Sequence, residues 1–127
     1  ASLGGPNNGA YDALVAAYSP DGRLLWTQQP GTSNDDWPYG VRIEAGTGNV
    51  ILGWRTNDGN MGVLSFFSVY SPAGALLGTL QLPAGWNDEQ ITQFTIDSSG
   101  NIYTSGELPW SGGNAIFFVN KYAPLSP

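Results

Sequence analysis

The chain contains neither histidine nor cysteine. Without cysteine, disulfide bonds, thiolate catalysis and Cys-ligated zinc sites are excluded. Without histidine the commonest general base is missing, and no G-x-S-x-G or S-x-x-K pattern supplies an activated nucleophile in its place. These absences argue against catalysis, and we expect the protein not to be an enzyme.

Positive charge and long hydrophobic stretches are also scarce. Four Lys and Arg residues stand against ten Asp and Glu, giving a formal net charge of −6. Such a field repels the phosphates of nucleic acids and anionic lipid surfaces. No stretch approaches the roughly 18 apolar residues that a membrane-spanning helix needs. We therefore expect no nucleic-acid partner and no membrane span.

What the chain does have is typical of a folded all-β protein. It is 41% hydrophobic and 13% aromatic, which is too apolar for a disordered chain. Eighteen Gly and nine Pro are scattered between short apolar runs, as in a protein with many turns. No helical periodicity competes with this pattern.

An internal repeat organises the sequence. Tyr18, Tyr70 and Tyr122 are spaced 52 residues apart, and each is followed by a small residue and a proline. Apolar runs precede all three tyrosines, and turn residues follow the first two. We define repeat 1 as about 10–57, repeat 2 as about 60–108 and a partial repeat 3 as about 113–127, within a single unit of residues 1–127.

Each repeat period is predicted to hold four short antiparallel strands. Four strands in roughly 50 residues is typical of a propeller blade. The predicted fold is therefore all-β, with four-stranded antiparallel propeller-blade repeats that amount to about two blades plus one extra strand. The predicted strands are 12–19, 23–28, 40–45, 49–55, 62–70, 75–81, 91–97, 101–106 and 115–122.

The order of these motifs resembles a known family. DALVAAYSPDGRLLW, then GTSNDDWPYGV, then GNVILGW is similar to the bacterial beta-propeller repeat called SBBP, and more loosely to the NHL-type blade. The resemblance implies that segments like YGVRIEA and GNVILGW form the two inner strands of a blade, and that FFSVYSPAGALLG forms the two outer ones. It implies a fold and says almost nothing about function.

If the strands are grouped into blades in this way, the chain supplies one whole blade and two incomplete ones. It contains an outer pair (12–28), a whole blade (40–81), and two inner strands with one outer strand (91–122). Bare strand edges and apolar blade faces need a cover. Either the chain is a segment of a longer propeller, or copies complete one another's blades as a ring or filament. We favour assembly, with Ile116, Phe117, Phe118, Val119 and Tyr122 as the assembly strand at the edge.

One acidic set of residues and one mainly aromatic set are candidates for ligand binding. Asn34-Asp35-Asp36 recurs as Asn87-Asp88-Glu89, and its acids suit Ca²⁺ as the one candidate cofactor, although Asn and Asp also form ordinary turns. The candidate calcium ligands are Asp35, Asp36, Asp88 and Glu89. The candidate sugar-binding residues, in or near connections, are Trp37, Trp54, Trp86, Asn87 and Trp110. The alternative for the aromatics is packing between blades, and we expect Arg55 to be solvated.

Together these observations predict a secreted or cell-surface bacterial protein. Its expected role is structural or adhesive, with itself as partner in a homo-oligomer or filament. The alternative, from a different class, is an oligomeric propeller lectin whose partner is carbohydrate.

Overall fold

The computed structural model describes residues 11–32, 34–57, 63–82, 90–108 and 116–124. These residues form nine strands, and none of them is helical, which confirms the all-β prediction. The strands are β1 (Val15–Tyr18), β2 (Leu24–Gln28), β3 (Asp36–Ile43), β4 (Val50–Asn57), β5 (Val63–Tyr70), β6 (Leu76–Gln81), β7 (Gln90–Ile96), β8 (Ile102–Leu108) and β9 (Ile116–Tyr122).

The strands make three antiparallel sheets. Sheet A is β1-β2, sheet B is β3-β4-β5-β6 and sheet C is β7-β8-β9, in that hydrogen-bonded order. This two, four and three grouping is the one that the sequence predicts. The strands pair with their sequence neighbours throughout, so each sheet is a simple meander.

The predicted strand boundaries differ from the observed ones by up to four residues, and the largest difference is at the start of β3. β3 begins at Asp36, four residues before the predicted start at residue 40, and it includes Pro38. Proline lacks a backbone N–H and usually breaks a strand. It is tolerated here because β3 is the edge strand of sheet B, and a register shift between Pro38 and Gly40 accommodates Tyr39. The same extension lengthens the partner strand β4.

Strand pairings recur at the spacing of the sequence repeat. In sheet B, Val50 pairs with Tyr70, and 52 residues later Ile102 pairs with Tyr122 in sheet C. The irregularity between Ala17 and Tyr18 in sheet A has its counterpart between Val69 and Tyr70 in sheet B. The sequence repeat and the backbone register therefore follow the same period.

The turns that join the outer strands repeat as well. Gly22 and Gly74 adopt φ angles of 91° and 93°, which L side chains rarely adopt, and they donate backbone hydrogen bonds to Ser19 and Ser71. Each serine hydroxyl in turn accepts a bond from the backbone four residues later. These turns hold β1 against β2 and β5 against β6.

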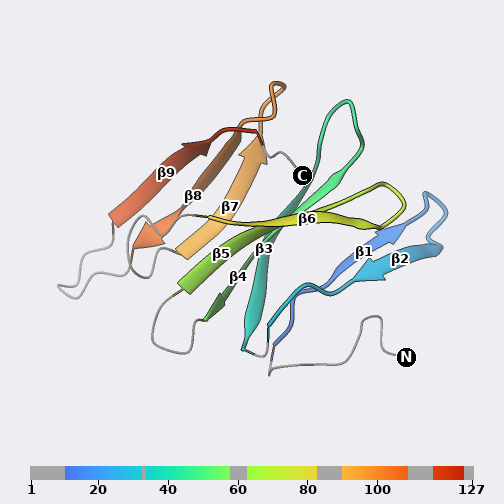
Figure 1. Ribbon diagram of the computed structural model, residues 1–127, viewed down its shortest axis with the longest axis horizontal. Coiled ribbons are helices and arrows are strands. Elements are labelled where there is room, and N and C mark those ends of the chain that lie inside the picture. The colour runs from blue at the N-terminus through green and yellow to red at the C-terminus, as the bar shows by residue number, and fades with distance from the viewer. Residues whose placement is uncertain (1–10, 33, 58–62, 83–89, 109–115, 125–127) are drawn as a thin grey trace.

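Sheet B lies between sheets A and C (Figure 1). The core consists of two clusters, one on each side of sheet B. Between sheets A and B lie Ala13, Val15, Val50, Leu52, Trp54 and Tyr70. Between sheets B and C lie Ile51, Phe67, Val69, Leu82, Ile91, Phe94 and Ile102. Neighbouring residues of β4 and β5 point to opposite clusters, as strand geometry requires, so the two central strands of sheet B are buried on both faces.

We name the faces by chain direction. The forward face of a sheet is the one turned toward the sheet that follows in the chain, and the backward face is turned toward the sheet that precedes it. The forward face of sheet A and the backward face of sheet C both pack on sheet B. The backward face of sheet A and the forward face of sheet C are the two outer faces. Within the described residues there is no helix that is long and apolar enough to cross a membrane.

Candidate functional site

The acidic segment before β3 is tied into local structure. Asp36 is 1% exposed, and its carboxylate accepts hydrogen bonds from the Thr32 backbone N–H at 2.8 Å and the Thr32 hydroxyl at 3.1 Å. The Asp35 carboxylate accepts a bond from the backbone N–H of Tyr11 at 3.2 Å. Contrary to the prediction of two loop acids, Asp36 belongs to β3, so its carboxylate secures the turn that leads into the strand.

Nothing in the described part of the chain assembles a metal site around these acids. No group of three or more Asp and Glu side chains comes together there. The second half of the predicted calcium set, Asp88 and Glu89, lies outside the described residues. The contacts of Asp36 fit the turn alternative, in which a short carboxylate satisfies nearby backbone and hydroxyl donors.

Trp37 lies in β3 rather than in a connection. Its ring is half-buried, stacked on Tyr11 with ring centroids 6.3 Å apart, and the Arg55 guanidinium lies 5.9 Å from the Trp37 ring centroid. Arg55 also donates a hydrogen bond to the backbone carbonyl of Ile91 at 3.2 Å. The expectation that Arg55 is solvated was therefore wrong: cross-strand pairing with Trp37 places it against sheet C.

Trp54 is a core residue rather than an open platform. Only 4% of it is exposed, its indole N–H donates to the Ser68 hydroxyl at 2.9 Å, and its ring stacks on Phe66 at 4.5 Å. The predicted strand 49–55 placed Trp54 one residue from its end and so near a connection. Because β4 continues to Asn57, Trp54 lies well inside the strand, and it points to the sheet A side. This is the packing role that the sequence left as the alternative.

A groove runs between the end of β2 and the backward face of sheet B. It has a volume of about 410 Å³. Its lining combines aromatic and hydroxyl or amide side chains, namely Gln28, Gln29, Pro30, Gly31, Thr32, Trp54, Phe66, Ser68, Tyr70, Leu76 and Thr79. Burial raises the pKa of Tyr70, so its hydroxyl stays neutral at physiological pH. A neutral, partly aromatic lining of this kind suits an uncharged polar ligand.

The candidate assembly strand lies at the edge of sheet C, as predicted, but its side chains divide between two faces. Phe118 and Tyr122 pack against the core on the backward face. Phe117 is 77% exposed and Val119 is 74% exposed on the forward face. The fifth candidate, Ile116, begins β9, and its side chain is outside the described set. The predicted strand is therefore half core and half open surface.

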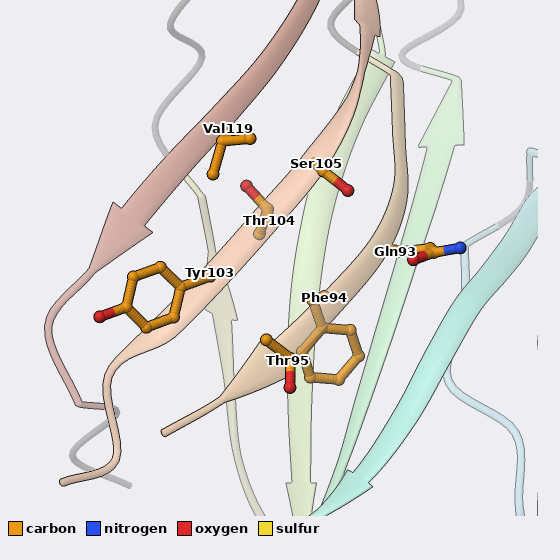
Figure 2. A pocket seen from close by; sticks show the side chains of 7 residues that line it. All are labelled: Gln93, Phe94, Thr95, Tyr103, Thr104, Ser105 and Val119. Carbon is orange, nitrogen blue, oxygen red and sulfur yellow. The ribbon is translucent and has the colours of Figure 1, made fainter. Parts of the chain in front are cut away.

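The forward face of sheet C also holds a shallow groove. Figure 2 shows it lined by Gln93 and Thr95 of β7, Tyr103 and Ser105 of β8, and Val119 of β9. Its volume is about 210 Å³. The Lys121 ammonium lies 5.8 Å from the centroid of the Tyr103 ring on the same face. The face is thus apolar near Phe117 and Val119 and more polar elsewhere.

The opposite outer face, on sheet A, is also uncovered. Leu14 is 36% exposed, Tyr18 is 53% exposed and Leu24 is 42% exposed. Tyr18 occupies the position of Tyr70, which is 52 residues later and only 2% exposed. The same kind of residue is therefore buried in sheet B and open in sheet A.

A third open area lies on sheet B itself. Val41 and Ile43 on β3 are 46% and 63% exposed. Their counterparts in the repeat are Phe94, which is 3% exposed, and Ile96, which packs against the core. Sheet A has two strands where sheet B has four, so no described strand of sheet A covers the β3 edge. Sequence reasoning missed Val41 and Ile43, although the predicted incompleteness of the first blade pointed to them.

Three of the predicted ligand residues remain untested by geometry. Trp86, Asn87 and Trp110 lie outside the described residues.

A scan against protein-family models and a search of curated proteins found no match to this chain. The class that the fold and the open faces define is therefore an all-β protein of antiparallel meander sheets stacked face to face.

Proposed function

We propose that this chain is a β-propeller-type repeat protein with a structural or adhesive role. It acts without catalysis, at the cell surface or outside the cell of a bacterium, and associates with copies of itself. Three antiparallel sheets stacked in chain order, with pairings that recur every 52 residues, support the propeller-type reading. The resemblance of the strand and turn motifs to the SBBP repeat supports it as well.

One observation carries the proposal: equivalent apolar positions are buried where a neighbouring sheet is complete and exposed where it is not. Phe94 is buried against sheet B, whereas its counterpart Val41 is 46% exposed beside the two-stranded sheet A. A soluble monomer rarely leaves such contiguous apolar surface in water. Strands from a second copy that lie beside β1 would complete sheet A and cover Val41 and Ile43.

The proposal is tested by the solution mass of wild type and two charge variants. Ile43→Asp places a carboxylate on the open area, whereas Ala73→Asp places the same charge in the exposed β5–β6 turn, where the first repeat already has Asp21. We expect a multimeric wild type, an Ile43→Asp protein shifted toward the monomer, and an unaffected Ala73→Asp protein. Light scattering behind a sizing column reads all three. A monomeric wild type over the accessible concentration range would remove the basis of the proposal.

Carbohydrate binding is the second candidate, and the groove beneath β2 favours it. Its lining pairs the rings of Phe66 and Tyr70 with the amide of Gln29 and the hydroxyl of Thr79, a combination that suits an uncharged sugar. Thr79→Trp fills the groove from its exposed side. We expect glycan-array binding by wild type that is lost in Thr79→Trp, and an absence of binding to any glycan would dismiss this candidate.

A further inference from the structure

The two outer faces of the chain match the two faces that already meet inside it. Resting on the proposed self-association, we propose that a second copy stacks the backward face of its sheet A on the forward face of sheet C. The contact is face to face, and it repeats the packing of sheet A on sheet B and of sheet B on sheet C. This contact is separate from the one proposed above, in which strands from a second copy lie beside β1 and complete sheet A.

The internal contacts define what each face offers. On forward faces, Val15 of β1 packs on sheet B, and Phe67 of β5, 52 residues later, packs on sheet C. On backward faces, Tyr70 of β5 packs toward sheet A, and Tyr122 of β9 packs toward sheet B. In both contacts the forward face of one sheet meets the backward face of the next.

The uncovered residues occupy these same positions. Val119 is the forward residue 52 positions after Phe67, yet it is 74% exposed, whereas Phe67 is fully buried. Tyr18 is the backward residue 52 positions before Tyr70, and it is 53% exposed. Leu14 precedes Phe66 by the same interval and is also open. The forward face of sheet C therefore has no backward face packed on it, and the backward face of sheet A has no forward face packed on it.

The contact is expected to be weaker than the internal ones. Lys121 stands at the position of Val69, which is 4% exposed in sheet B. Its ammonium lies over Tyr103, so its stem covers part of the face and leaves Phe117 and Val119 as the apolar contact. A smaller apolar area gives reversible, concentration-dependent association rather than a permanent joint.

The geometry makes the assembly head to tail. Each copy presents one forward and one backward face, so the contact is heterologous and continues as a ring or a filament. A symmetric dimer through two forward faces is not expected, because both internal contacts use the repeat position of Val15 and Phe67 on one side and that of Tyr70 and Tyr122 on the other. This difference makes the inference separable from self-association in general.

The absence of cysteine from the chain permits a clean crosslinking test. Val119→Cys labels the forward face of sheet C, and Leu14→Cys labels the backward face of sheet A. Ser98→Cys, in the exposed turn between β7 and β8, is the matched control. The full chains, one carrying a mass tag, are mixed and treated with a short bismaleimide, and circular dichroism confirms that each variant is folded.

We expect crosslinked dimer in the mixture of Val119→Cys with Leu14→Cys, and only the Ser98→Cys background in either variant alone. Equal crosslinking of Val119→Cys to itself would overturn the inference in favour of a symmetric contact. Multimers without the mixed crosslink would also overturn it, and the proposed function would then stand on other surfaces. Monomers at every concentration would contradict both.

Discussion

Alanine substitution at one repeat position is expected to reduce the stability of the fold in one copy of the repeat and to weaken self-association in another. Phe67 and Val119 lie 52 residues apart, at the same place on the forward faces of sheets B and C, and they are 0% and 74% exposed. Phe67→Ala empties a site between Tyr39 and Phe94, whose rings lie 6.2 Å and 4.9 Å from it. We expect it to lower the free energy of unfolding by about 3 to 5 kcal/mol.

Val119→Ala is expected to have almost no effect on the isolated chain. Most of the side chain is already in water, so the loss is below about 0.5 kcal/mol. In the assembly, however, the two lost methyl groups would be covered by a second copy. At about 0.8 kcal/mol each, their removal weakens association by about 1.6 kcal/mol, or roughly 15-fold in the dissociation constant.

Urea unfolding followed by tryptophan fluorescence, at a low and a high protein concentration, measures both effects. For Phe67→Ala the large loss is present at either concentration. For Val119→Ala the loss emerges only at the concentration where wild type is assembled. A loss above about 1 kcal/mol for Val119→Ala in the dilute monomer would refute the reasoning, because it would place Val119 inside the core.

Three further predictions concern single residues. Thr104 is 1% exposed, and its hydroxyl has no hydrogen-bond partner among the described residues. Thr104→Val should therefore raise the free energy of unfolding by about 1 kcal/mol, measured by urea unfolding, and a decrease in that free energy would contradict this prediction. Gly53 lies so close to Tyr39 that an added methyl group overlaps the ring, and Gly53→Ala should cost about 1 to 3 kcal/mol in the same assay, whereas a neutral result would mean that the ring moves freely. A hydrogen bond from the Asn101 side chain, together with backbone hydrogen bonds, holds the pKa of Asp97 below its ordinary value. The ionised Asp97 carboxylate therefore stabilises the fold at pH values above the pKa that it has in the unfolded chain. This stabilisation is lost as the pH falls through the pKa that it has in the folded protein. Asp97→Asn should therefore flatten the acid limb of the stability curve below about pH 4, and an unchanged limb would contradict this assignment.

The sheet grouping was predictable from the sequence because it depends on local signals. The spacing of Tyr18, Tyr70 and Tyr122, with the turn glycines that follow the first two, locates the outer hairpins. Alternation of apolar residues locates the remaining strands. Each strand pairs with its neighbour in the chain, so no long-range choice of partner had to be made.

The candidate site was less predictable because exposure depends on which sheets are complete. Trp54 lies near the end of the predicted strand 49–55, and only the longer β4 shows that it is a core residue. Asp36 resembles a free acid in the sequence, but its carboxylate accepts a hydrogen bond from Thr32. The open state of Val41 follows from the number of strands in the neighbouring sheet rather than from its own sequence context. Local pattern specifies the strands, and tertiary arrangement decides which of their residues remain available.

The measurement that tests self-association most directly is the solution mass of the wild-type chain by light scattering over a rising series of concentrations, with negative-stain images of the same samples. The account predicts a mass that climbs above that of one chain, with rings or short filaments in the images. A mass that stays at one well-folded chain throughout the series, with no assemblies in the images, would contradict it.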